Sequence, residues 1–320
     1  MTPSIPKSFK DIYDTHDLIK PHIVRTPVLN NESLNELSGA DLYFKCENFQ
    51  KIGAFKARGA LNALLRLSKE TLKKGVATHS SGNHAQALAY ASKIVGTKAT
   101  IVMPANSARI KIDGVRKLGG KIIFCEPTTE DRERKLKAFI ANEGAVYIPP
   151  YNHEWIIAGQ GTAAMELIED CAGLDAIVAP VGGGGLISGT AIYSKIMDSR
   201  IHVFGAEPEN LDDAKRSLVS GKLEKNTELK SSIADGLRTT LGDITFQCIR
   251  DHVQDILTVT EGEIVSSMKL IWQHLKITAE PSCAVTLAAI LKEMQYFKGK
   301  KVGVIISGGN VDFSDIPFMK

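Results

Sequence analysis

The sequence predicts an α/β fold with two open, twisted, mainly parallel β-sheets flanked by helices, arranged as a large and a small domain with the active site in the cleft between them. Short apolar runs alternate with amphipathic stretches along the chain, which is the pattern of βαβ units. Four strand-like runs lie between residues 75 and 149, and Pro149-Pro150 follows them. We therefore expect residues 75–147 to form a small mobile domain and residues 1–74 and 148–320 to form a large domain.

The individual elements follow from this alternation, taken in chain order. Strands are expected at 42–46, 75–80, 99–103, 121–125, 145–149, 176–181, 202–207, 256–259 and 302–307, where β-branched and apolar residues cluster. Helices are expected at 57–67, 83–95, 109–118, 130–143, 155–171, 186–197, 261–275 and 282–294.

The composition and charge of the chain limit the partners and the cellular location that we expect. The 320 residues are 43% hydrophobic and 23% charged, enough to bury a sizeable core. The net charge is only +3 and the basic residues are scattered, so neither nucleic acid nor a membrane is an expected partner. The chain opens without an apolar signal core, which favours the cytoplasm. Its five cysteines are far apart and mostly in apolar runs, so we expect reduced thiols.

Lys56 has small or apolar neighbours in Gly53-Ala54-Phe55-Lys56-Ala57, and it directly precedes the helix expected at 57–67. A lysine in such company is expected to be partly buried. Burial disfavours the ammonium ion and lowers the pKa, which makes the amine a nucleophile. An inert lysine in the first turn of a packed helix is the alternative, and this segment alone does not decide between them.

Four consecutive glycines, Gly182, Gly183, Gly184 and Gly185, stand between the strand expected at 176–181 and a helix that starts at Leu186. Backbone N–H groups without side chains can surround a phosphate, and the helix N-terminus attracts its negative charge. The spacing is neither that of the dinucleotide fingerprint nor that of a Walker loop. A small phosphorylated cofactor is therefore the expected ligand.

Two further strand ends carry small polar residues. The segment Ser80-Ser81-Gly82-Asn83-His84 leads into a helix, where hydroxyl, amide and N–H groups suit a carboxylate or a ring hydroxyl. An ordinary helix cap explains this segment equally well. Ser307-Gly308-Gly309-Asn310 brings another hydroxyl to the end of the last strand. Ligands of open parallel sheets bind at such strand ends.

Six segments together carry a family resemblance over nearly the whole chain: 53–60, 80–84, 158–162, 182–185, 234–236 and 307–310. In this order they resemble the serine racemase and serine/threonine dehydratase family, closest to serine racemase. This family belongs to the pyridoxal-phosphate (PLP) enzymes of fold type II, which have the tryptophan synthase β-like fold. The resemblance implies pyridoxal 5'-phosphate as cofactor, a small amino acid as substrate and a homodimer. It also suggests a nucleotide as an effector.

The resemblance assigns roles to the cofactor-binding residues. Lys56 would hold the cofactor as a Schiff base, and the four glycines would bind its phosphate. Asn83 would contact its ring hydroxyl and Ser307 its pyridine nitrogen. The implied cofactor set is Phe55, Lys56, Asn83, Gly182, Gly183, Gly184, Gly185, Leu186, Gly236, Glu280 and Ser307, and the implied substrate set is Ser80, Ser81, Gly82, Asn83, His84 and Arg132.

Ser81 refines the expected reaction. In the racemases that this chain resembles, the second serine of Ser-Ser-Gly-Asn-His protonates the face opposite the lysine, whereas catabolic threonine dehydratases typically have alanine there. We therefore interpret the chain as a serine racemase with serine/threonine ammonia-lyase activity, in which Lys56 and Ser81 are the two catalytic bases. Ser81 as a simple helix cap in a dehydratase is the alternative.

The loop after the strand at 202–207 offers oxygen ligands for a metal ion. Carboxylates and carbonyls suit Mg²⁺ or Ca²⁺ and do not suit zinc. By resemblance to serine racemases, Glu207, the Leu211 carbonyl and Asp213 would bind Mg²⁺, Ca²⁺ or Mn²⁺. Without the resemblance, a solvated acidic loop is an equally good interpretation of these residues.

Arg132 matches an arginine that, in the racemases, lies in the small domain and turns toward the substrate. A guanidinium there can also clamp a second carboxylate. This supports an alternative function, L-threo-3-hydroxyaspartate ammonia-lyase. Tyr151 and His153 can shape the same pocket, although aromatic packing at a domain junction is the favoured interpretation. An amino-acid sensor that keeps the fold without the chemistry is the non-enzyme alternative, and it predicts a degenerate Lys56 or glycine turn, which the sequence does not have.

Overall fold

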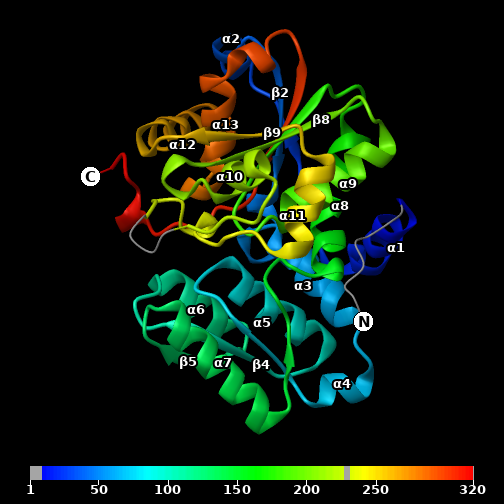
Figure 1. Ribbon diagram of the computed structural model, residues 1–320, viewed down its shortest axis with the longest axis vertical. Helices are drawn as coiled ribbons and strands as arrows, with labels where there is room; N and C mark the ends of the chain where they lie inside the picture. The colour runs from blue at the N-terminus through cyan, green and yellow to red at the C-terminus, as the bar shows by residue number, and fades with distance from the viewer. Residues whose placement is uncertain (1–8, 227–230, 320) are drawn as a thin grey trace.

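The computed structural model describes residues 9–226 and 231–319 and is shown in Figure 1. Its strands are β1 (Val28–Leu29), β2 (Asp41–Cys46), β3 (Val76–His79), β4 (Ala99–Pro104), β5 (Lys121–Cys125), β6 (Val146–Tyr147), β7 (Ala176–Pro180), β8 (His202–Pro208), β9 (Asp255–Val259) and β10 (Lys301–Ile306). Its α-helices are α1 (Phe9–Ile19), α2 (Glu32–Ser38), α3 (Lys56–Leu65), α4 (Lys69–Lys73), α5 (Asn83–Val95), α6 (Arg109–Lys117), α7 (Thr129–Glu143), α8 (Glu154–Asp170), α9 (Gly185–Met197), α10 (Asp213–Ser220), α11 (Asp243–His252), α12 (Glu261–Leu275) and α13 (Pro281–Lys292).

The strands form a six-stranded sheet in the order β1-β2-β10-β7-β8-β9 and a four-stranded sheet in the order β5-β4-β3-β6. Every pair is parallel except β1 with β2. The predicted fold class is therefore confirmed. Each strand and helix predicted from the sequence is present, and β1, α1, α2, α4, α10 and α11 are additional. The four-stranded sheet comes from the region predicted to be the small domain, whose mobility stays a prediction.

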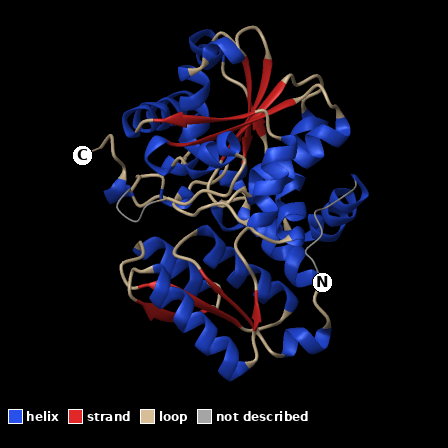
Figure 2. Cartoon of the chain, viewed as in Figure 1, coloured by secondary structure: helices blue, strands red, loops and turns tan. Residues whose placement is uncertain are grey.

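Helices cover both faces of each sheet (Figure 2). On one face of the six-stranded sheet, α12 and α13 pack against the strands, with Val285 and Ile271 in a core that includes Leu42 and Val304. On the other face, Ile187 of α9 and Ile249 of α11 pack against Ile177 and Ile305. In Figure 1 the layers of the four-stranded sheet lie below those of the six-stranded sheet.

Helices α3, α8 and α9 approach one another through glycines. A Cβ atom on Gly159 of α8 would lie 2.5 Å from the Cα of Gly59 in α3, and one on Gly161 would lie 2.9 Å from the carbonyl oxygen of Gly189 in α9. Real side chains do not fit such distances, so these glycines permit close helix contact. The segment 158–162 of the family resemblance therefore fixes the position of α3.

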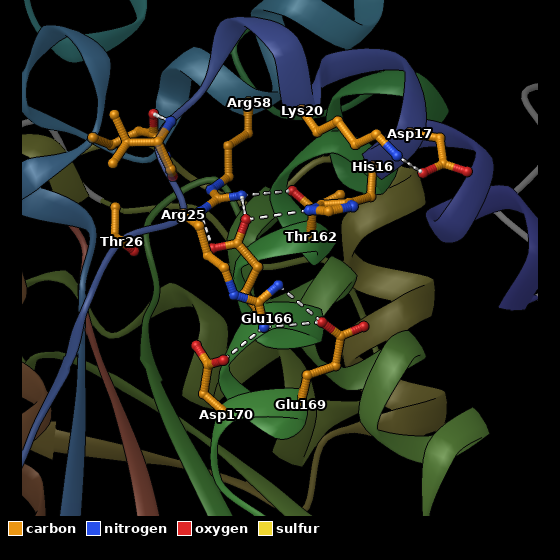
Figure 3. A network of polar contacts seen from close by, with 12 residues as sticks. His16, Asp17, Lys20, Arg25, Thr26, Arg58, Thr162, Glu166, Glu169 and Asp170 are labelled. Atoms are coloured by element: carbon orange, nitrogen blue, oxygen red, sulfur yellow. Dashed lines mark hydrogen bonds and ion pairs between the residues drawn. The ribbon is translucent and has the colours of Figure 1, made fainter.

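A buried ionic network also holds α3 (Figure 3). Arg58 is fully buried and donates two hydrogen bonds of 2.8 Å to Glu166 and bonds of 2.7 and 2.8 Å to Glu47. Lys45 lies 2.8 Å from Glu166, so two cations face two carboxylates. Burial alone would raise the pKa of Glu166, but hydrogen bonds from His16 and Arg58 and the charges of Arg58 and Lys45 hold that pKa well below its usual range.

Loss of Arg58 is expected to destabilise the fold strongly. Arg58→Met leaves Glu47 and Glu166 buried without their bidentate partner, and breaking such a pair costs about 3 kcal/mol of unfolding free energy. The matched control is Arg25→Met, because Arg25 pairs with Glu169 and Asp170 at the surface, where a pair contributes about 1 kcal/mol at most. Urea unfolding of both variants measures the difference. Equal losses of unfolding free energy in Arg58→Met and Arg25→Met would show that burial of the Arg58 network contributes nothing to stability.

Candidate active site

A cavity of about 150 Å³ lies where both sheets change their winding direction. In the four-stranded sheet the chain runs from β3 through β4 to β5 and then returns to β6 on the other side of β3. In the six-stranded sheet it runs from β7 through β8 to β9 and returns to β10 on the other side of β7. Such switch points, at the carboxyl ends of parallel strands, are the usual ligand sites of open sheets. One pocket serves both switch points, since Ser80, Pro150, Pro180 and Ser307 all line it.

Four helices begin at this cavity: α3 at Lys56, α5 at Asn83, α9 at Gly185 and α13 at Pro281. None of the four has a side chain that caps its first turn. Elsewhere, α2, α4, α7, α8 and α12 each have a capping side chain, whereas α6, which contributes Lys111 to the cavity lining, has none. Uncapped N–H groups and the positive ends of four helix dipoles therefore favour an anionic ligand in the cavity.

The glycine turn before α9 cannot accept side chains. Gly184 has a φ of 86°, a left-handed conformation that favours glycine. A Cβ on Gly183 would lie 2.3 Å from the ring of Tyr151, and one on Gly182 would lie 3.0 Å from the Cα of Leu237. The turn is thus a cradle lined by backbone, closed on one side by an aromatic ring.

Lys56 is positioned by the end of β10. The N–H of Phe55 donates to the carbonyl of Ser307 at 3.0 Å, and Ala54 forms a β-bridge with Gly308, so α3 starts beside that strand end. The Lys56 amine donates to the Pro150 carbonyl at 2.8 Å. Burial lowers the pKa of Lys56 to about 8. A buried amine with a lowered pKa is suited to nucleophilic and base chemistry.

The turn before α5 brings the predicted substrate residues to the cavity lining. The hydroxyl of Ser80 accepts a hydrogen bond of 3.2 Å from the N–H of Gly82. Asn83 donates to Glu280 at 2.9 Å and accepts from Asn310 at 2.9 Å, which fixes its amide. His84 is buried, and burial together with the charge of Lys56 lowers its pKa to about 3. His84 is therefore neutral.

Glu280 is an unusual carboxyl group in this cavity. It is 3% exposed, and burial raises its pKa to about 7 against the opposing charge of Lys111. Its Oε1 accepts from Asn83, whereas its Oε2 is buried without a hydrogen-bond partner among the described residues. A buried acceptor of this kind favours a ligand that supplies a donor.

The cavity lining brings together every residue predicted for the cofactor and the substrate, including Phe55, Ser81, Gly82, Leu186, Gly236 and Arg132. Their individual roles stay predictions. Tyr151 also lines the cavity. His153 does not line it. Its Nδ1 caps α8 by accepting from the N–H of Trp155 at 3.1 Å, and its ring packs edge-on against the Trp155 ring, in agreement with the interpretation as aromatic packing.

The residues predicted to bind a metal ion do not line the cavity and form a separate buried cluster. Glu207 is 1% exposed and accepts from the N–H groups of Ala214 and Lys215 at 3.3 and 2.8 Å. Asp213 accepts from Asn226 at 2.6 Å and from the N–H of Leu241 at 3.1 Å. Within residues 9–226 and 231–319, no three His, Cys, Asp or Glu side chains are grouped to hold a metal ion.

Sequence reasoning missed two charged residues of the cavity, Lys111 and Asp235. They form an ion pair across it. Asp235 lies within 234–236, one of the segments that carry the family resemblance, so it could have been predicted as a residue of the site. Lys111 gave no such signal, because a single lysine on an amphipathic helix usually faces solvent.

The residues present fit pyridoxal phosphate. The cradle that a Cβ atom would fill and the uncapped start of α9 suit a phosphate group. The amine of Lys56 is buried and its pKa is lowered, as covalent attachment to an aldehyde requires. The Glu280 oxygen without a partner leaves room for a ligand donor.

Comparisons with known proteins agree with this geometry. Residues 19–308 match the family model described as pyridoxal-phosphate dependent enzyme. The chain is 49% identical to β-hydroxyaspartate dehydratase of Paracoccus denitrificans, over 97% of this chain and 98% of that protein. It is 50% identical to serine racemase of Dictyostelium discoideum, over 99% and 98%. The crystal structure of the Dictyostelium serine racemase superposes with a TM-score of 0.90 and covers 95% of this chain and 98% of that chain.

The resemblance stated from the sequence, and with it the cofactor, is confirmed by these matches. They extend over nearly the whole chain, at identities well above those at which only a fold is shared. The chain belongs to the family of pyridoxal-phosphate dependent enzymes.

Proposed function

We propose that this enzyme is a serine racemase that also eliminates the β-hydroxyl group of serine and threonine. One observation carries the proposal: Lys56, at the start of α3, and Ser81, in the turn after β3, line the same cavity. Racemisation needs two acid/base groups on opposite faces of the substrate α-carbon. The identity of 50% to a serine racemase supports the same reaction.

When bound, pyridoxal phosphate supplies an electron sink for the carbanion at the substrate α-carbon. The Nζ of Lys56 removes the α-proton of the L-amino acid, and its lowered pKa makes the neutral amine available near neutral pH. The Oγ of Ser81 donates a proton from the other face to give the D-amino acid. Loss of the β-hydroxyl from the same carbanion gives pyruvate and ammonia from serine.

Ser307 favours that elimination. It lies at the end of β10 and lines the cavity, and we expect it to face the pyridine nitrogen of the cofactor. A neutral hydroxyl group there would supply a hydrogen bond but no negative charge. The cofactor would then be a weaker electron sink, which would favour departure of a β-hydroxyl over reprotonation.

A second function, ammonia-lyase action on L-threo-3-hydroxyaspartate, is favoured by Arg132. Its side chain lines the cavity, and its Nε is buried without a hydrogen-bond partner among the described residues. A guanidinium in this state suits the second carboxylate of a hydroxyaspartate. The relative in Paracoccus denitrificans, named β-hydroxyaspartate dehydratase, supports this alternative at 49% identity.

Chiral chromatography of reactions with L-serine separates these functions, when it is run beside assays with L-threonine and L-threo-3-hydroxyaspartate. The proposed racemase forms D-serine together with pyruvate. An enzyme that forms no D-serine and consumes hydroxyaspartate far faster than serine is the ammonia-lyase. An amino-acid sensor binds the cofactor and consumes none of the three substrates.

The rate of covalent cofactor attachment is expected to follow the ionisation of Lys56. Only the neutral amine attacks the aldehyde, and the pKa of about 8 sets the fraction that is neutral. Below pH 7 the attachment rate should rise about tenfold per pH unit, and above about pH 9 it should level off. Stopped-flow absorbance of cofactor-free protein measures it. A rate that still rises tenfold per unit above pH 9 would show an unperturbed lysine.

We also propose a divalent-ion site at Glu207, Asp213 and the Leu211 carbonyl, taking Mg²⁺, Ca²⁺ or Mn²⁺. Burial raises the pKa of Glu207 well above its usual range and that of Asp213 to about 6, and the charge of Asp213 raises the pKa of Glu207 further. Burial thus disfavours the charged form of both carboxyl groups in the absence of a cation. A cation with oxygen preference compensates that charge, with water completing the shell.

Removal of the ion is expected to destabilise the protein. An ion bound only to the native state at 100 times its Kd contributes about 2.7 kcal/mol, so chelator should lower the melting temperature. Asp213→Ala should remove this response to chelator, whereas Glu209→Ala, at an exposed position of the same loop, should keep it. Thermal unfolding with and without chelator measures both. A parent protein indifferent to chelator would make the cluster a plain acidic loop.

The expected homodimer, cytoplasmic location and nucleotide effector stay predictions. None of the helices described in residues 9–226 and 231–319 has the length and apolar character needed to cross a bilayer.

A further inference from the structure

Lys111 and Asp235 form an ion pair between the two layers of the fold. Lys111 belongs to α6, which packs on the four-stranded sheet. Asp235 begins the short 3₁₀ helix Asp235–Leu237, beside the core of the six-stranded sheet. The Lys111 side chain is 5% exposed, so its ammonium group lies inside the cavity wall.

The pair joins the two turns that build the cavity. A Cβ on Gly82, in the turn before α5, would lie 3.7 Å from the Nζ of Lys111. On the other side, Asp235 is followed by Gly236 and Leu237, whose backbone lies against Gly182 of the glycine turn. The ion pair therefore connects the predicted substrate turn with the predicted phosphate turn.

A third charged group faces the same ammonium group. Glu280 and Lys111 interact, and their charges oppose the effect of burial on each other's pKa. The carboxylate of Glu280 accepts the hydrogen bond from Asn83. Glu280 therefore adds a second carboxyl group whose charge interacts with the Lys111–Asp235 pair.

We propose that Lys111 is a positioning residue that acts across the cavity: paired with Asp235, it holds the two cavity turns together. The proposal deepens the proposed function and depends on it only for the identity of the bound ligand. Opening of the cavity requires this pair to separate.

The test compares Lys111→Met, Asp235→Asn and the double variant with the parent, each as full-length protein. Hydrogen exchange at residues 80–84 and 235–237 reports separation of the two turns without any activity measurement. Each single variant should exchange about fivefold faster there, since Asp235 is partly exposed and the pair is only partly screened. The double variant should exchange about as fast as each single variant, because all three lose the same Lys111–Asp235 ion pair. Lys111→Arg keeps the charge and should restore slow exchange.

Lys117→Met is the matched control, because Lys117 is exposed on the same helix. It should leave exchange at both turns unchanged. Cofactor dissociation, followed by absorbance, should be faster in Lys111→Met and near the parental rate in Lys111→Arg. The proposal is overturned if Lys111→Met exchanges like Lys117→Met, if the double variant shows the product of the two single effects, or if Lys111→Arg restores nothing. Since exchange is measured without substrate, these outcomes are independent of which amino acid the enzyme converts.

Discussion

Lys56→Ala protein is expected to lose at least about 10⁴-fold in turnover of every amino-acid substrate. The alanine removes both the covalent attachment point of the cofactor and the group that takes the α-proton. The parent protein should be yellow, and borohydride should bleach its absorption band while fixing the cofactor to Lys56. Mass spectrometry of a peptide digest locates that attachment.

Lys51→Ala provides the control, since Lys51 is an exposed lysine five residues earlier in the chain. It should keep the colour, the borohydride reaction and the activity. Substrate conversion by Lys56→Ala at the parental rate would refute the mechanism.

Ser81→Ala is expected to abolish D-serine formation, by about 10³-fold or more, and to leave much of the elimination from L-serine. Proton removal by Lys56 starts both reactions, and only racemisation needs the proton from Ser81. Reaction of D-serine should disappear with it, because Ser81 would then have to remove the α-proton. Chiral chromatography and a pyruvate assay on the same samples measure the two outcomes.

Ser81→Thr retains a hydroxyl group at this position and should retain part of the racemisation. An equal loss of D-serine and pyruvate in Ser81→Ala would contradict the two-base reaction, because it would make Ser81 a substrate-binding residue only.

Much of the fold could be predicted because inner strands such as β4, β7 and β10 are buried on both faces and are continuous apolar runs. The missed elements lack that signal. Strand β1 has two residues and exists through its pairing with β2, which is a tertiary contact. Helix α1 is mostly polar, and it buries Ile12 and Ile19 through packing against α8, which is a tertiary contact. Helix α10 is short and begins at Asp213, which the sequence presented as part of an acidic loop.

The candidate site could be predicted where its residues form local segments. A strand end followed by a helix start marks the glycine turn, Lys56 and the turn at 80–84. This pattern can be recognised in the amino-acid sequence itself. The contacts that join these segments were not visible, because Lys111 and Asp235 are 124 residues apart. The burial of Glu280, which raises its pKa to about 7, likewise depends on packing from several elements.

The uncapped starts of α3, α5, α9 and α13 also determine how the protein must be handled. Inorganic phosphate and sulfate match the charge and size of the cofactor's own phosphate group, and helix N-termini bind such ions readily. Phosphate buffers and ammonium sulfate precipitation thus supply competitors for the glycine turn during purification. Reconstitution with cofactor is best done in a buffer free of both anions, and a crystal grown from sulfate will hold that ion where the cofactor belongs.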